Sequence, residues 1–238
     1  MRLIKYISGL IILILFHTAS YAQAHYNAWF RGTISAAIHP KIKLDAELQH
    51  RRQNGFQNTN MLHKPLMYSV RTWVHYQHDE GLRFSVSPFA CFSNNGIIQQ
   101  KEDEWSLPNH EIRFTAAIEL QKPLLNKLHY MIRPAIEYRW FRERNNQISR
   151  LRNKVGLKYE IGKNLNVLVY NELLLNVTGV SKAHFFDHNR LGALIEYKLS
   201  QKIKAELGYI YIHRLPLYHN ISLAENNIAM NITYQLYP

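Results

Sequence analysis

The most constraining feature of the sequence is a strict alternation of apolar and charged residues in two neighbouring segments between residues 129 and 160. In the first, Ile136 and Tyr138 alternate with Glu137 and Arg139. The second alternates Leu151, Val155, Leu157 and Tyr159 with Arg150, Arg152, Lys154 and Lys158. Successive side chains of a strand point to opposite faces, so one face is apolar and the other is a row of ions.

Segments of this kind recur along nearly the whole chain, each of roughly 10 to 13 residues, the length that a tilted strand needs to cross a bilayer. The pattern predicts an all-β fold, an antiparallel transmembrane β-barrel of about 10–12 strands with a charged, filled lumen. The alternative is a soluble secreted sandwich, in which the apolar faces would pack against each other.

The first 22 residues read as a secretory signal peptide. Arg2 and Lys5 form a basic start, residues 10–16 are purely apolar, and Ser20 and Ala22 are small residues at the positions that a signal peptidase inspects. The apolar run is well short of the ~20 residues of a membrane-spanning helix, which is the other interpretation. We expect cleavage before Gln23, a barrel over residues 23–238, and export to the outer membrane of a Gram-negative cell.

Tight turns alternate with longer polar loops, as short periplasmic turns alternate with extracellular loops in bacterial barrels. About eleven strands can be counted, whereas single-chain bacterial barrels have an even number, so ten or twelve are expected. Pro88 and Pro134 fall inside predicted strands and predict bulges or breaks there. The last strand, which alternates from Ile228 to Leu236, resembles the signal read by the barrel-insertion machinery, a predicted partner, although Pro238 follows Tyr237 where an aromatic residue normally ends that signal.

The chain carries a formal net charge of +12, and loss of Arg2 and Lys5 with the leader leaves +10. Nucleic acid is not an expected partner, because the chain is exported and has no nucleic-acid-binding motif. Phosphates of lipopolysaccharide are the expected anionic neighbours, or else the cations form an ordinary solvated rim. The cations predicted for this rim are Arg51, Arg52, Arg142, Arg144, Lys182 and Arg214. Cys91 is the single cysteine, so no internal disulfide can form.

Interleaved Glu and Arg residues fall on the inward register of the predicted strands. We expect them to pair, since an unpaired ion in a narrow lumen carries a desolvation cost. The predicted lumen charge network consists of Glu47, Arg51, Glu111, Arg113, Arg133, Glu137, Arg139, Arg150, Arg152, Glu172 and Arg190.

An ordered set of short patterns spans the mature chain and resembles the domain of unknown function 2490 family, which consists of outer-membrane β-barrels of Gram-negative bacteria. The patterns are Trp29, the Glu47 and Arg51 pair, His110-Glu111-Ile112-Arg113, the Glu137 and Arg139 pair, Arg150-Leu151-Arg152, Asn171-Glu172-Leu173, Asp187-His188-Asn189-Arg190 and Leu207-Gly208-Tyr209. His188 stands where the family pattern tends to have Gln. The resemblance implies an outer-membrane barrel and brings no activity, substrate or catalytic residue.

Three functions remain open at this point. A structural or narrowly permeable barrel, held shut by its ion pairs, is the favoured interpretation. An anion-preferring channel would use Arg133, Arg139, Arg150 and Arg152 as its attractive wall.

A lipid-modifying enzyme would need a nucleophile within reach of its base. His50, His110 and His213 are expected to face lipid, whereas Ser93, with Ser85 and Ser87, is expected to point inward, away from them. The prediction is therefore of no enzyme activity, no catalytic residue, no metal site and no cofactor.

Overall fold

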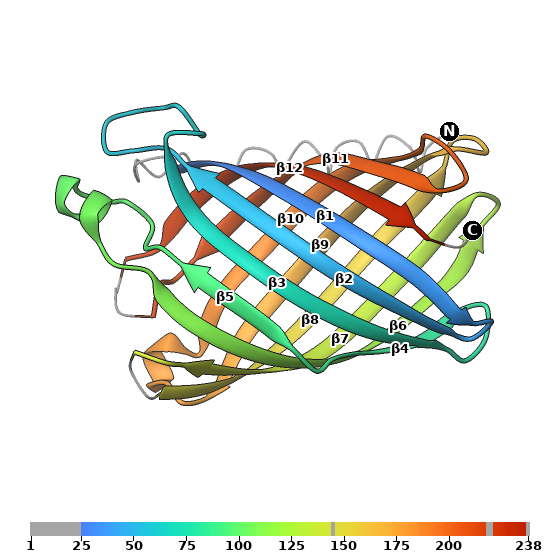
Figure 1. Ribbon diagram of the computed structural model, residues 1–238, viewed down its shortest axis with the longest axis horizontal. Coiled ribbons are helices and arrows are strands. Elements are labelled where there is room, and N and C mark those ends of the chain that lie inside the picture. The colour runs from blue at the N-terminus through green and yellow to red at the C-terminus, as the bar shows by residue number, and fades with distance from the viewer. Residues whose placement is uncertain (1–24, 144–145, 218–220, 237–238) are drawn as a thin grey trace, which may run out of the picture.

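The computed structural model describes residues 25–143, 146–217 and 221–236, and the predicted signal peptide lies outside these ranges. They form one closed sheet that wraps into a barrel (Figure 1). The strands are β1 (His25–His39), β2 (Ile42–Gln53), β3 (Lys64–Gln77), β4 (Leu82–Ser87), β5 (Ala90–Asn94), β6 (Asn109–Leu125), β7 (Leu128–Phe141), β8 (Asn146–Glu160), β9 (Leu165–Thr178), β10 (Phe186–Lys198), β11 (Ile203–Arg214) and β12 (Leu223–Gln235). Two short 3₁₀ helices, η1 (Lys101–Trp105) and η2 (Lys182–His184), lie in the connections.

Eleven positions make up the wall, because β4 and β5 are two halves of one interrupted strand. Both halves pair with β3 on one side and with β6 on the other. Neighbours in sequence pair antiparallel, but the barrel closes by a parallel ladder between β1 and β12, with Phe30 opposite Met230. Eleven lies within the predicted range, and the expectation of an even number is wrong: with an odd count, the first and last strands run in the same direction.

The connections sort to the two ends of the barrel. The tight-turn end carries residues 40–41, 78–81, 126–127, 161–164 and 199–202. The long-loop end carries residues 54–63, 95–108, 142–143, 179–185, 215–217 and 221–222 and lies on the left of Figure 1. Strand β1 starts at the long-loop end and β12 finishes at the tight-turn end.

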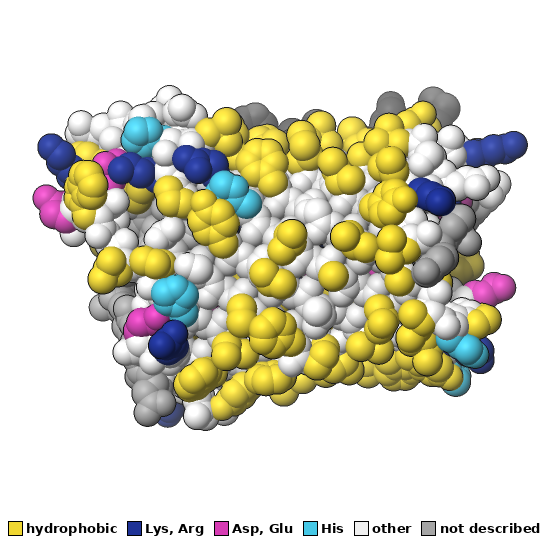
Figure 2. Space-filling view, in the orientation of Figure 1, with side chains coloured by type: hydrophobic (Ala, Val, Ile, Leu, Met, Phe, Trp, Pro, Cys, Tyr) yellow, Lys and Arg dark blue, Asp and Glu magenta, His cyan; other side chains and the backbone are white. Residues whose placement is uncertain are grey.

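A belt of large apolar side chains covers the outside of the wall (Figure 2). Leu48 is 64% exposed and Ile136 is 52% exposed, although both lie in the middle of regular strands. No helix of the described ranges has the length and apolar character to span a bilayer. So much exposed apolar surface is compatible with a hydrocarbon environment and not with water, so the fold is a transmembrane β-barrel and the sandwich alternative is wrong.

The break at Pro88 and Phe89 reverses the alternation of the strand. Ser87 is fully buried in the lumen and Ala90, three residues later, is fully buried there too. Because side-chain direction has a period of two, this odd spacing moves every later residue to the other face. Phe92 therefore points into the barrel and Ser93 points outward, so the predicted inward direction of Ser93 is wrong.

The parallel seam can be tested by cross-linking in a Cys91→Ser background. We expect Phe30→Cys and Met230→Cys to be joined by a short bifunctional thiol reagent, because their Cα atoms are register partners. The cross-link would be read as altered migration on a denaturing gel. In the control, Phe30→Cys with Tyr234→Cys, the second cysteine is displaced by about 13 Å along β12 and should not react. Cross-linking of the control alone would contradict this closure.

Candidate ion-pair network and vestibule

Glu137 of β7 is the centre of the lumen charge network. Its side chain is 0% exposed and is surrounded by four arginines from three strands. Arg150 donates to Oε1, Arg152 Nη1 lies 3.2 Å from Oε2, Arg71 Nη2 lies 3.6 Å from Oε2, and Arg113 Nη1 lies 3.9 Å from Oε1. A carboxylate that is excluded from water needs such partners to offset its desolvation.

Glu111 of β6 accepts bidentate hydrogen bonds from two arginines. Arg113 donates through Nε and Nη2 at 2.6 and 2.9 Å, and Arg139 donates through the same pair of atoms at 2.5 and 3.1 Å. On the other side of the centre, Glu172 accepts from Arg152 Nε at 3.0 Å and from Arg190 Nη1 at 3.0 Å. Bidentate pairs are the strong form of charge-assisted hydrogen bond. The network extends across the lumen from Glu111 on β6 to Arg190 on β10.

The structure places all of the predicted network residues on the inner side of the wall. Besides those already described, Arg133 Nε lies 3.5 Å from Glu119, and Glu47 lies 3.5 Å from Arg31 Nη1. Arg51, also inside, has no ion pair among the described residues.

A β-bulge at the start of β10 adds two residues that the sequence did not assign to the lumen. The register with β9 shifts between Phe186 and His188, so Asp187 and His188 both point inward, 4% and 1% exposed. Asp187 accepts from Arg150 and lies 3.2 Å from His188 Nδ1. No local signal marks such a bulge, because strict alternation would send one of two consecutive residues outward.

A vestibule of about 460 Å³ opens above the network at the long-loop end. Among the described residues, six arginines and four acidic residues line it, so positive charge is in excess. The arginines are Arg51, Arg113, Arg139, Arg150, Arg190 and Arg214, and the acids are Asp103, Glu111, Asp187 and Glu225.

Two guanidinium groups lie over one indole in the wall of the vestibule. The Cζ atom of Arg51 lies 3.6 Å from the ring centroid of Trp29, and that of Arg190 lies 5.6 Å from it. Arg51 donates to Gln49 Oε1 at 3.2 Å, while its buried Nε has no partner. Stacking fixes the plane of Arg51, so an unneutralised cation is held in place beside the cavity.

The predicted rim of cations needs correction at two positions. Arg51 and Arg214 lie inside the barrel, where Arg214 donates to Glu225 and Asn27 binds the same carboxylate at 3.0 Å. The alternation along β2 also predicts that Arg51 points into the lumen. For Arg214 the sequence gives no such indication, because nothing in it marks where β11 ends. Glu225 lies in the lumen because the start of β12 brings it opposite His25 of β1. Arg144 lies outside the described residues.

Comparison with solved structures finds other barrels. The NanC porin, solved in a rhombohedral crystal form, is 14% identical, with a TM-score of 0.55 over 89% of this chain and 99% of that chain. LpxR from Salmonella typhimurium is 9% identical, with a TM-score of 0.49 over 81% of this chain and 83% of that chain. At such low identities the likeness concerns the fold alone.

Comparison by sequence supplies the family. No match was found among curated proteins. Residues 26–215 match the family described as protein of unknown function (DUF2490), and this range includes every strand from β2 to β11. The match covers most of the chain and the whole lumen charge network, so this protein belongs to the DUF2490 family.

Proposed function

We propose that this protein is an outer-membrane β-barrel of a Gram-negative cell whose interior is closed to free diffusion by its Glu and Arg network. The observation that carries the proposal is the Glu137 carboxylate, 0% exposed amid four arginines. A pore that conducts would keep the charges of its constriction in contact with water, whereas these contact one another.

The export and insertion of the chain follow from the same proposal. A signal peptide over residues 1–22 and the apolar belt support passage to the outer membrane, where the barrel-insertion machinery would fold it. The exposed cations Arg142 and Lys182 at the long-loop end would then lie near lipopolysaccharide phosphates.

The test is conductance in a planar bilayer. We expect the refolded wild type to give no discrete current steps, and Arg139→Ala with Arg152→Ala to give steps or leakage, because these two side chains fill the lumen beside Glu111 and Glu172. The matched control, Arg142→Ala with Lys182→Ala, removes the same charge from the outside and should remain silent. Refolding of each variant is checked by its heat-dependent gel migration.

Discrete anion-selective steps in the wild type would contradict the closed lumen and support the conduit instead. A silent double variant that has refolded would show that other side chains close the barrel.

A second candidate function is the binding of small anions in the vestibule. The specific observation is Arg51, which has no carboxylate partner among the described residues and lies over the ring of Trp29 beside a cavity of about 460 Å³. Guanidinium groups bind carboxylate and phosphate through paired N–H donors, so an oxyanion would fit between Arg51 and its neighbours.

Trp29 offers a direct readout of this second candidate. Inorganic phosphate added to the refolded protein is expected to change tryptophan fluorescence, and Arg51→Gln should weaken the apparent affinity about 10-fold or more, the effect of losing one charge-assisted contact. Arg52→Gln is the matched control, because Arg52 lies outside the lumen and donates to the carbonyl oxygens of Leu62 and His63. Equal titrations for the two variants would exclude Arg51 as the anion ligand.

A further inference from the structure

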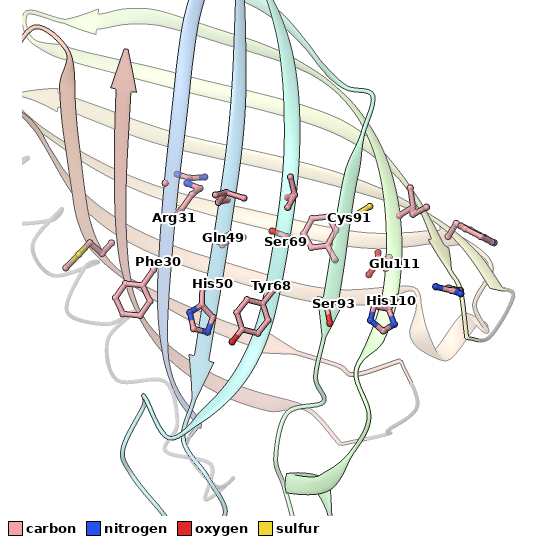
Figure 3. A pocket seen from close by; sticks show the side chains of 18 of the residues that line it. Phe30, Arg31, Gln49, His50, Tyr68, Ser69, Cys91, Ser93, His110 and Glu111 are labelled. Atoms are coloured by element: carbon pink, nitrogen blue, oxygen red, sulfur yellow. The ribbon is translucent and has the colours of Figure 1, made fainter. Parts of the chain in front are cut away.

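A single row of side chains crosses the outer face of five neighbouring strand positions near the long-loop end. The register partners are Phe30 and His50, His50 and Tyr68, Tyr68 and Ser93, and Ser93 and His110. Figure 3 shows these five side chains side by side along the row. Ser93 belongs to this row because the break at Pro88 turns it outward. From the alternation alone, Ser93 was expected to point inward and His110 to face lipid, on opposite sides of the wall.

Glu143, in the loop after β7, contacts His110, the last member of the row, through both of its carboxylate oxygens. Its Oε1 lies 2.5 Å from His110 Nδ1, and its Oε2 accepts the backbone N–H of His110 at 2.8 Å. The His110 hydrogen bond lowers the pKa of Glu143, so the carboxylate is ionised at neutral pH. A carboxylate on Nδ1 fixes the tautomer in which Nδ1 carries the proton and Nε2 is a free acceptor.

Ser93 stands next to that imidazole on the neighbouring strand. Directly opposed residues of an antiparallel pair have Cβ atoms about 4.5–5.5 Å apart. No hydrogen bond joins Ser93 to His110 among the described residues. Rotation of the serine hydroxyl about χ1, with the ring held by Glu143, is the movement that would bring Oγ to Nε2, and nucleophile–base contacts commonly tighten in this way when substrate binds.

The row borders a groove of about 840 Å³ in the outer wall (Figure 3). Its outward-facing lining includes Leu48, Val70, Met230 and Ile232, which belong to the exposed apolar belt. Arg142, directly after β7, also lines it and places a cation beside His110. Apolar side chains below the row and a cation at its end match the two parts of a membrane lipid, the acyl chain and the phosphorylated headgroup.

We propose that Ser93, His110 and Glu143 form a catalytic triad on the outer face of the barrel, which hydrolyses an acyl ester of a phosphate-bearing membrane lipid. Ser93 Oγ attacks the ester carbonyl while His110 Nε2 takes the hydroxyl proton. The C–O bond to the lipid alcohol breaks, and that alcohol leaves with the proton from His110. Water, deprotonated by His110, then cleaves the acyl–Ser93 ester, which releases a fatty acid and restores the hydroxyl.

The neighbours of Ser93 and His110 supply groups that the reaction needs. Tyr68 flanks Ser93 on the side opposite His110. Its ring stacks on His50 with centroids 4.3 Å apart, so its phenol would have to turn toward Ser93 to donate to the oxyanion of the tetrahedral intermediate. The triad acts at the lipid-facing surface and does not depend on whether the lumen is closed.

Polar side chains at the border of an apolar belt are also ordinary features of barrels, and the experiment must separate the two roles. Refolded protein is incubated with vesicles of phosphatidylglycerol and phosphatidylethanolamine, or with purified lipopolysaccharide, and released fatty acid is measured by mass spectrometry. A fluorophosphonate probe, which labels activated serines, is applied in parallel, and the labelled peptide is identified.

We expect fatty acid release from at least one of the two lipids and labelling at Ser93. Ser93→Ala and His110→Asn should each lower the release by about 100-fold or more, as loss of a triad member does, and Glu143→Gln should lower it less than these two. Tyr68→Phe should reduce the rate without loss of labelling. The lipid that is cleaved identifies the source of the acyl ester.

The matched controls are Ser149→Ala and His213→Asn, an outward serine of β8 and an outward histidine of β11 near the same end. Both should keep the wild-type rate, and all variants should show the heat-dependent migration of a folded barrel. Folded wild-type protein that cleaves neither lipid would overturn the proposal, as would Ser93→Ala protein that releases fatty acid at the wild-type rate.

Discussion

Replacing Glu137 with glutamine is expected to lower the free energy of unfolding of the barrel by about 3–5 kcal/mol, the cost of removing one member of a buried ion cluster. The substitution keeps the shape of the side chain but leaves four guanidinium groups without their shared anion at a position that is 0% exposed. Arg71 and Arg113 would be affected along with the directly bound Arg150 and Arg152. Urea unfolding in lipid vesicles, followed by tryptophan fluorescence, measures the change.

Glu160→Gln is the matched control for this prediction. Glu160 ends β8, its side chain is 46% exposed, and its Oε1 lies 3.6 Å from His129 Nδ1. An exposed pair of this kind contributes about 0–1 kcal/mol, so the control should unfold almost as the wild type does. If the two substitutions cost the same, the lumen network contributes no more than a surface pair, and the proposal of a barrel held shut by Glu137 loses its basis.

Gly192→Ala is expected to destabilise the barrel by about 1–3 kcal/mol through overpacking of the lumen. A Cβ atom on Gly192 would lie 2.4 Å from Tyr170 Cζ and 2.7 Å from its hydroxyl oxygen. Tyr170 is the register partner of Gly192, is only 6% exposed, and has Lys154 Nζ 3.8 Å from its ring centroid, so the ring cannot swing aside freely. The same urea titration provides the measurement.

Gly32→Ala provides the comparison within the same wall. Nothing lies within 4 Å of a Cβ built on Gly32, so alanine there should be neutral or slightly stabilising, since it only reduces the freedom of the unfolded chain. Adding Tyr170→Leu to Gly192→Ala removes the clashing ring and should recover part of the lost stability. Failure of that second substitution to recover any stability would show that the cost arises from something other than the contact with Tyr170.

The alternation of residues was sufficient to predict the wall, because it reports directly which face each residue takes. It placed Glu137 and Arg139 on one side and Ile136 and Tyr138 on the other, as the structure has them. Alternation fails where an interruption of a strand shifts the residues that follow to the other face. Pro88 indicates such an interruption, but not whether it contains an odd or an even number of residues. That number depends on the contact with β3, where the backbone N–H of Thr72 donates to the carbonyl oxygen of Phe89 at 2.9 Å.

The pairings within the lumen lay beyond the sequence for a different reason. The alternation shows which charged residues point inward and can form ion pairs. Which of them pair depends on the strand register and on the diameter of the closed barrel. Arg71 reaches Glu137 although they lie on β3 and β7, which are not neighbours in the sheet. The direction of the closing ladder was equally hidden, because an alternating strand has the same two faces whichever way it runs. Predicting that Ser93 lies opposite His110 would need both the parity of the break at Pro88 and the register between β5 and β6.

Because the seam between β1 and β12 is parallel, the first and last residues of the wall lie at opposite ends of the barrel. With an even number of antiparallel strands, they would lie at the same end. His25, the first residue of β1, lies at the long-loop end, and Gln235, the last residue of β12, lies at the tight-turn end. No turn can tether the seam, and parallel pairing is slightly weaker per residue than antiparallel pairing. The seam is therefore held by its ladder from His25 and Glu225 to Ser35 and Gln235 alone, and we expect the closed wall to open first at this joint when the barrel unfolds.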